Sequence, residues 1–180
     1  MERIEREGHL EPYVEMAREL FLDYSGWLER RFGLSLDFQG FEQEMAEFPG
    51  VYTPPGGRLI VATVDGEAAG CIASKPKLPA TCEMKRLYVR DSFRGRRLGE
   101  KLVAALIEEA RAAGYRRMVL DTSREMVLGL SRTFPKIVRV KLWTEVSMSL
   151  FICSSFFHLP SHPCYTRSQL TARYEVALTL

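Results

Sequence analysis

The residues of this chain best suited to bind a ligand lie in a basic turn, residues 90–99, between a predicted strand and a predicted helix. The turn contains three arginines directly before the helix: Arg94, Arg96 and Arg97. A helix start carries unpaired N–H groups and a partial positive charge, so each cation there costs on the order of 0.3–1 kcal/mol unless an anion lies among them. Gly95 and Gly99 let a ligand approach the backbone closely. The turn therefore predicts a binding site for a phosphate or pyrophosphate.

The alternative interpretation of this turn is that its arginines point into water, which screens most of their repulsion. The spacing fits neither the dinucleotide-binding pattern Gly-x-Gly-x-x-Gly nor a P-loop, because no Gly-Lys-Ser/Thr follows. Taken alone, the turn leaves both interpretations open.

The elements before the turn are predicted from the spacing of apolar residues. Helical spacing predicts one long helix or two in succession over residues 10–32, and a shorter helix over 38–48. A period of two then predicts strands, with the hairpin Asp65-Gly66 between the first two and a loop over 75–81 before the third. These strands cover residues 58–64, 68–74 and 82–90.

The elements after the turn complete a strand–helix–strand unit. An apolar stripe predicts a helix that begins at Leu98 and ends near Gly114, and a short strand follows over 116–121. This order predicts an α/β fold with a mixed sheet. In the strand before the turn, alternation places Tyr88 on the face opposite to a set of four residues. These are Glu83, Lys85, Leu87 and Val89.

The composition limits the class of protein. The chain has 180 residues, a net charge of +2 and 46% hydrophobic residues, which is typical of a single globular domain spanning 1–180. Near-zero charge argues against nucleic-acid binding by the whole surface. Residues 1–13 lack the apolar core of a signal peptide, and the apolar run 148–153 is far shorter than the roughly 20 residues of a membrane span. We expect a cytoplasmic protein with no nucleic-acid or membrane partner and with reduced cysteines.

Three segments together resemble a known family: EMKRLYV at 83–89, FRGRRLG at 93–99 and ARAAGY at 110–115. With Leu120-Asp121-Thr122, and over about residues 10–130, they resemble the GNAT superfamily of N-acetyltransferases. The phosphate loop of that family usually reads Arg/Gln-x-x-Gly-x-Gly/Ala, and Arg97 stands where its middle glycine is common. The resemblance implies a mixed, mostly antiparallel central sheet flanked by helices, with an atypical C-terminal part.

The resemblance also implies a cofactor and a reaction. Acetyl-CoA would donate an acetyl group to a primary amine of a small molecule, a peptide or a protein. Its pantetheine arm would pair with the backbone of Leu87, Tyr88 and Val89. Its pyrophosphate would be held by backbone amides of the turn. The turn residues concerned are Arg94, Gly95, Arg96, Arg97, Leu98 and Gly99.

Catalysis requires a base and an acid. Glu83 occupies the strand position where some GNAT proteins carry the base that deprotonates the amine. The alternative is that Glu83 pairs with Lys85 or another nearby cation. The family often places a tyrosine acid in a later run, but residues 130–136 read LSRTFPK instead, and Tyr88 and Tyr115 are weak substitutes. A non-catalytic acyl-CoA-binding or regulatory module therefore remains the alternative function.

The last part of the chain differs from the rest. Residues 126–180 contain two acids, Glu145 and Glu175, and 131–171 match nothing in the family, although 172–178 resemble its final strand. The sequence leaves a homodimer open, because this tail could complete a sheet within one chain or across two. Four tail residues fit no zinc pattern, and we expect no metal. They are Cys153, His158, His162 and Cys164.

Two further expectations concern charge. Acidic side chains such as Glu42 or Glu44 are candidates to attract the amine acceptor. A patch for nucleic acid is the third interpretation, but only Tyr88 and Phe93 could serve as the interleaved aromatic residues that such a patch requires. It would consist of Lys85, Arg86, Arg90, Arg94, Arg96 and Arg97.

Overall fold

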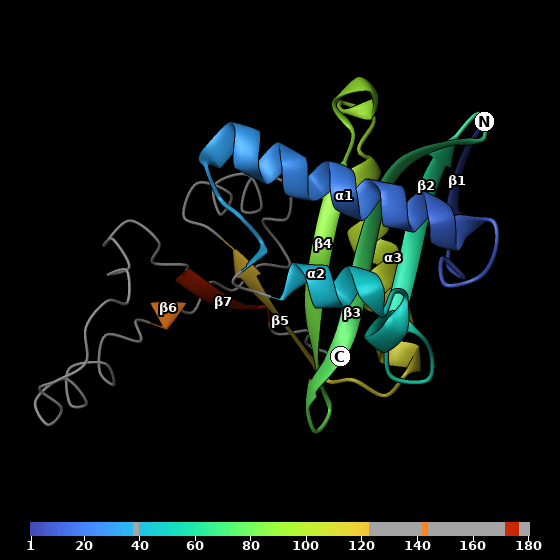
Figure 1. Cartoon of the computed structure of the whole chain (residues 1–180). Helices are drawn as coiled ribbons and strands as arrows, with labels where there is room; N and C mark the ends of the chain where they lie inside the picture. The colour runs from blue at the N-terminus through green and yellow to red at the C-terminus, as the bar shows by residue number, and fades with distance from the viewer. Residues whose placement is uncertain (38–39, 123–141, 144–171, 177–180) are drawn as a thin grey trace, which may run out of the picture. The chain divides into compact units, whose positions relative to one another are not determined.

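A computed structural model describes residues 1–37, 40–122, 142–143 and 172–176 of the chain (Figure 1). By internal contacts the chain divides into two compact units, and the boundary between them falls between Val119 and Leu120. The first unit contains all the side chains discussed below. In the second unit, β6 (Leu142–Trp143) pairs antiparallel with β7 (Ala172–Val176).

The first unit is built on an antiparallel meander. Its strands are β1 (Glu2–Glu5), β2 (Arg58–Val64), β3 (Glu67–Leu78) and β4 (Thr81–Val89), adjacent in that order. β5 (Arg117–Thr122) follows β4 in the sheet. The backbone N–H groups of Arg116 and Arg117 donate to Ala80 O, at 2.9 and 3.1 Å, so β5 begins beside the start of β4. Both strands therefore run in the same direction, as a helical crossover between them requires.

Helices cover both faces of the meander. Figure 1 shows α1 (Tyr13–Phe32) and α2 (Phe41–Ala46) in front of β2–β4, with α3 (Leu98–Ala112) behind them. Two short 3-10 turns, Gly50–Tyr52 and Asp91–Phe93, complete the first unit. Among the described helices, none has both the length and the apolar character that crossing a membrane requires.

Each long helix buries the stripe that its sequence predicts. Ala17, Leu20 and Phe21 of α1 have no exposed surface. Neither do Leu102 and Leu106 of α3, and Ile60 of β2 is equally buried between the two helical layers. Burial of this apolar surface is the main favourable contribution to the fold.

Helix ends also follow sequence signals. α1 ends at Gly33, whose φ of 64° is readily adopted by glycine and whose N–H donates to Glu29 O at 2.9 Å. After α3, Gly114 has a φ of 84° and its N–H donates to Arg111 O at 2.9 Å. The predicted helix over 10–32 is thus one helix, and the predicted C-terminal glycine of the second long helix is confirmed.

One strand was not predicted, and two local predictions were wrong in extent. β1 was not predicted, because Ile4 is its single apolar residue and its strand conformation depends on pairing with β2. β3 continues through Pro76 to Leu78, where a loop was expected. Proline is tolerated there because β2 begins at Arg58, opposite Ser74, which leaves β4 as the described partner of this part of β3. The predicted helix over 38–48 is the six-residue α2 in its described part.

A β-bulge in β4 changes which residues share a face. Cys71 pairs with Tyr88 and Ala73 with Lys85, so β4 has one more residue than β3 between these pairs, and Arg86 takes a φ of 58°. β3 pairs regularly with β2 over this stretch, so its alternate residues Cys71, Ala73 and Lys75 share one face. Their partners Tyr88, Lys85 and Glu83 must share it as well.

The bulge thus corrects the expectation from simple alternation. Tyr88 lies on the same face as Glu83, and this is the face covered by α1, because the Tyr88 ring contacts Tyr24 at 5.7 Å and Trp27 at 6.1 Å between centroids. Leu87 and Val89 flank Tyr88 and therefore point to the opposite face. The spacing of apolar residues in the sequence gives no signal for one extra residue in a strand.

Candidate functional site

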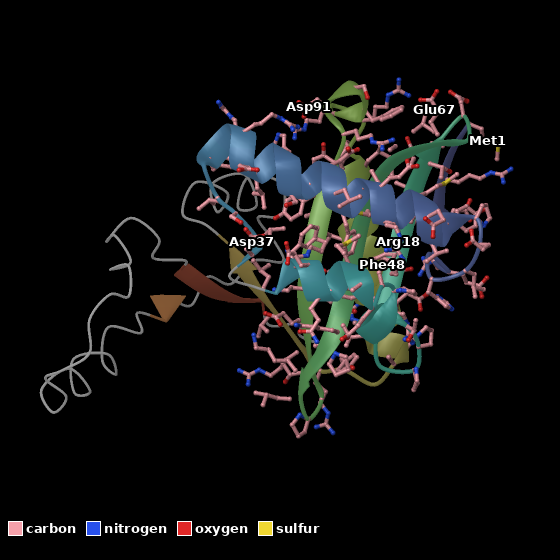
Figure 2. All side chains as sticks on the ribbon, in the orientation of Figure 1. Met1, Arg18, Asp37, Phe48, Glu67 and Asp91 are labelled. Atoms are coloured by element: carbon pink, nitrogen blue, oxygen red, sulfur yellow. The ribbon has the colours of Figure 1, made fainter. Side chains whose placement is uncertain are left out.

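The basic turn is exposed and directly precedes α3. Residues 91–97 are exposed or half-buried, and Leu98 is the first buried residue after them. Figure 2 shows Asp91 in this turn, beyond the end of β4 and beside the C-terminal half of α1. Gly95 has a φ of 83° and Arg97 a φ of 59°, and these two left-handed residues bend the chain into the helix. The turn is therefore accessible to a ligand from solution.

Backbone donors at this turn have room for a ligand. Lys101 is the first residue of α3 whose N–H reaches back to a helical acceptor, Arg97 O, at 3.2 Å. Within the described chain the N–H groups from Gly95 to Glu100 donate to no backbone oxygen. A Cβ atom added at Gly95 or Gly99 would meet no heavy atom within 4 Å. Unpaired amides beside open space form the kind of cradle that accepts an anion.

The arginines of the turn are better compensated than the sequence suggested. Arg97 pairs with Glu100, with Nε to Oε2 at 3.0 Å, and Arg94 pairs with Asp91 at 2.8 Å. The guanidinium of Arg96 lies 5.8 Å from the centre of the Phe93 ring. Two of the three arginines thus have an acidic partner three positions away in the chain. The open amides carry the case for an anion site more strongly than the charges do.

Contacts with α1 and β3 fix the position of the turn. The Arg90 side chain donates to Asp23 on α1 at 2.7 Å and to Ala68 O on β3 at 2.8 Å. The Arg94 guanidinium lies 5.1 Å from the Trp27 ring centre, and its Nε is 3.3 Å from Val89 O. Arg90 was considered for a nucleic-acid patch, and its contacts instead give it a structural role.

The strand that leads into the turn supplies backbone groups at three predicted positions. Val89 pairs with Gly70 and Tyr88 with Cys71, so β3 occupies one edge of β4 there. Leu87 and Val89 are half-buried, and Tyr88 is buried. The bulge at Arg86 immediately precedes this segment and bends the strand. The predicted pantetheine contact of Leu87, Tyr88 and Val89 stays a prediction.

Glu83 is the centre of a buried cluster of charges. Its side chain is 7% exposed, and its Oε1 accepts from Lys77 Nζ at 3.0 Å. Lys75 and Lys85 each place Nζ 3.9 Å from the same carboxylate. Burial acts to raise the pKa of Glu83, but Lys85, Lys77 and Lys75 outweigh it, so the pKa is lowered. The predicted pairing with a cation is confirmed, and the catalytic role stays a prediction.

A second buried ion pair links the bulge to α2. The Arg86 side chain is 2% exposed and donates through Nε to Glu44 Oε1 at 2.9 Å. The Tyr52 hydroxyl donates to the same oxygen at 2.8 Å, and the Phe41 ring centre lies 5.2 Å from the guanidinium. Glu44 is therefore paired inside the protein, whereas the other candidate, Glu42, is exposed on α2. Attraction of an amine by these acids stays a prediction. Burial of Arg86 also removes it from any exposed basic patch.

Neighbouring contacts hold α2 and the segment after it against α1. Arg18 of α1 donates to Met45 O at 2.8 Å and to Phe48 O at 3.3 Å, and it lies 5.0 Å from the Phe48 ring centre. Figure 2 shows Arg18 and Phe48 together where α1 passes α2. The position of Glu44 over β4 is thus fixed from two sides.

The two tyrosines considered as substitute acids differ in their surroundings. The Tyr115 hydroxyl donates to Gly56 O at 2.9 Å and fastens a surface loop. The pKa of Tyr88 is raised by burial and by the nearby carboxylates of Asp23 and Asp91, so Tyr88 keeps its proton at neutral pH. Residues 130–136 and the four tail residues considered for zinc lie outside the described residues.

The sequence of residues 14–127 matches the model of the Acetyltransferase (GNAT) family, and these residues are more than half of the chain. The chain belongs to the GNAT acetyltransferase family. An uncharacterized N-acetyltransferase of Schizosaccharomyces pombe is 45% identical to this GNAT chain over 95 residues, which cover 52% of the chain and 58% of the relative. The chain thus matches little more than half the length of that curated relative.

Solved acetyltransferases share the fold of this GNAT chain. A GNAT-family acetyltransferase from Staphylococcus aureus superposes with a TM-score of 0.70 at 16% identity, covering 99% of this chain and 100% of that one. The PaiA N-acetyltransferase of Thermoplasma acidophilum, solved with coenzyme A, gives 0.62 at 14% identity, covering 98% and 99%. The predicted mixed, mostly antiparallel sheet flanked by helices is confirmed.

Sequence reasoning missed the partners of the predicted site residues. Lys75 and Lys77 were assigned to a loop, although they lie on β3 beside Glu83. The pair between Glu44 and Arg86 joins residues 42 positions apart, and the sequence offers no local signal for it. An acid on a short helix and an arginine in a strand become partners through the tertiary fold alone.

Proposed function

We propose that this GNAT protein transfers an acetyl group from acetyl-CoA to a primary amine. The observation that carries the proposal is the open start of α3, where the N–H groups from Gly95 to Glu100 have no described backbone acceptor and Gly99 faces free space. A pyrophosphate needs several converging donors and close access to backbone, and this turn offers both.

The residues present fit coenzyme A in two places. The Arg94 N–H already donates to Asp91 O at 3.2 Å, so backbone amides from Gly95 to Gly99 would hold its pyrophosphate. The side chains of Arg94 and Arg96, both exposed, would face it. Backbone groups of Leu87, Tyr88 and Val89 would pair with its pantetheine amides in the manner of an added strand. When bound, acetyl-CoA supplies the acetyl group as an activated thioester.

In this proposal Glu83 takes a proton from the acceptor. An amine at neutral pH is an ammonium ion and must lose a proton before it can attack the thioester. The lysines around Glu83 keep its pKa low, so the carboxylate is ionised and able to accept that proton. A lowered pKa also weakens the base, and a bridging water would relay the proton from an acceptor that does not touch Glu83.

Titration of the whole protein with acetyl-CoA by calorimetry tests the cofactor assignment. We expect saturable binding that Arg94→Glu weakens and Gly99→Trp abolishes, because one inverts a charge at the turn and the other fills its open space. Arg3→Glu is the matched control, since Arg3 is exposed on β1, which is separated from β4 by β2 and β3. No binding by the unmodified protein refutes the proposal.

Release of free thiol in the presence of a panel of amines tests the reaction itself. We expect CoA release that depends on both acetyl-CoA and an amine. Binding of acetyl-CoA without release by any amine supports the alternative, a non-catalytic acyl-CoA-binding module. The two measurements therefore separate cofactor binding from chemistry.

A further inference from the structure

We infer that the acceptor amine also carries an acidic group, a carboxylate or a phosphate, which Lys75 and Lys77 bind next to Glu83. The inference rests on the proposed function in one respect, because it places the acceptor beside Glu83. It adds a substrate class, acidic amines, to a reaction that otherwise accepts any primary amine.

The geometry around Glu83 leaves ammonium donors unused by its carboxylate. Lys77 is within hydrogen-bond distance of Glu83, at 3.0 Å, but Lys75 stays 3.9 Å away. Each ammonium has three donor hydrogens, and one carboxylate accepts a limited number of them. Lys75 and Lys77 together also exceed the charge of Glu83 by one. A second anion would satisfy both the remaining donors and the remaining charge.

Local backbone structure directs both lysines to this point. Lys75 pairs directly with Glu83 across the two strands. Pro76 pairs with Cys82 and Leu78 with Thr81, which leaves Lys77 as the extra residue of a bulge in β3. Bulges commonly redirect one side chain, and here the bulged side chain reaches the Glu83 carboxylate.

The side chains of this cluster differ in how much of their surface is exposed. The Glu83 side chain is 7% exposed, whereas Lys75 and Lys77 are 36% and 28% exposed. A molecule that approaches Glu83 therefore meets the two ammonium groups at the rim before the carboxylate. Solvent screens charges beside a buried group less than charges in open water, so the positive charges of Lys75 and Lys77 favour the approach of an anionic group.

The charge of Glu44, one of the two acids expected to attract a cationic amine, is compensated by a neighbouring cation. Glu44 is bound by Arg86 and Tyr52 inside the protein. A plain amine, itself a cation, is repelled by Lys75 and Lys77. An acceptor that carries its own anionic group compensates them and leaves its amine beside Glu83.

Pairs of acceptors that differ by one acidic group test the inference. Lysine and cadaverine differ by a carboxylate, and phosphoethanolamine and ethanolamine differ by a phosphate. With saturating acetyl-CoA, we expect kcat/KM from CoA release to be at least about tenfold higher for the acidic member of at least one pair. The two pairs also tell a carboxylate acceptor from a phosphate acceptor. Equal or better use of the plain amines overturns the inference.

Variants of Lys75 and Lys77 test whether these two lysines cause the preference for acidic acceptors. Lys75→Gln with Lys77→Gln should reduce the acidic-to-plain ratio of kcat/KM toward one, whereas the control Arg3→Gln removes an exposed cation from β1 and should leave the ratio unchanged. Glu83→Gln should lower the KM for the acidic acceptor while it lowers kcat, because the competing carboxylate is gone. A ratio unchanged in the double variant overturns the inference.

A binding measurement covers the case in which no amine is acetylated. Calorimetry of the same pairs on protein saturated with CoA should show tighter binding of the acidic member, and loss of that preference in the double variant. Absence of any preference overturns the inference. Failure of acetyl-CoA itself to bind instead removes the proposed function, and the acceptor pairs can then still be compared on the protein alone.

Discussion

Gly99→Ala should make the protein more stable and a poorer binder of acetyl-CoA. Gly99 is the second residue of α3, and a Cβ there would meet no heavy atom within 4 Å. Alanine is favoured over glycine in a helix by about 0.5–1 kcal/mol, so the free energy of unfolding should rise by that amount. For a chain of this size that corresponds to an increase in Tm of about 1–4 °C.

The same methyl group should obstruct the cofactor. In a helix the Cα–Cβ bond tilts toward the N-terminus, so the new methyl projects toward the amides that we assign to the pyrophosphate. We expect the Kd for acetyl-CoA to rise at least about tenfold, which is 1.4 kcal/mol of binding free energy. Urea denaturation gives the stability change, and calorimetry gives the Kd.

Gly26→Ala is the matched control. Gly26 lies inside α1, where an added Cβ would meet only the flexible end of Arg30, at 2.9 Å. This substitution should also stabilise the helix and leave the Kd for acetyl-CoA unchanged. A Gly99→Ala protein that is more stable yet binds acetyl-CoA as tightly as the unmodified protein would refute the assignment of the pyrophosphate to this turn.

Glu83→Gln should lower kcat about a hundredfold or more with little change in the KM for acetyl-CoA, because general-base catalysis contributes about 10²–10⁴-fold. A smaller loss in the rate of CoA release would contradict the role of Glu83 as the base. Lys77→Met should raise the pKa of Glu83, because Lys77 helps to hold that pKa below its usual 4.5. The acid limb of the pH–rate profile should therefore move to higher pH, and an unmoved limb would mean that another group titrates. Glu44→Gln leaves the buried Arg86 without its counter-ion and should lower the free energy of unfolding, measured by urea denaturation, by about 3–5 kcal/mol. Glu44→Leu combined with Arg86→Met should lower it less, because no unpaired charge stays buried. A larger loss in the double variant would contradict this reasoning.

How far the sequence predicts the fold depends on how local each signal is. Helical periodicity located α1 and α3, and the hairpin predicted at Asp65-Gly66 is present, with Val64 paired to Glu67. These signals act between residues a few positions apart, where propensity and apolar spacing agree. β1 carries one apolar residue and has no such signal, because a strand at the edge of a sheet is stabilised by its neighbour.

The candidate site was also predicted only where its signals are local in the sequence. The turn was located from its own residues, since Gly95, Gly99 and the arginines are contiguous with the start of α3. The partners of its arginines were not predicted, although the acids that pair with Arg94 and Arg97 each lie three positions from their arginine. A helical turn brings such positions together, and the spacing was a usable signal.

By itself the sequence determined the order of the elements from α1 to β5, the family and the position of the basic turn, because each is encoded in neighbouring residues. The tertiary structure alone decided which face of β4 Glu83 occupies, because a single bulged residue at Arg86 reverses the alternation that follows it. It also decided the partners of Glu83 and Arg86. Lys77 reaches Glu83 because of a second bulge, in β3, and Glu44 reaches Arg86 from α2. Contacts of this kind depend on register and packing between elements, and no run of neighbouring residues specifies them.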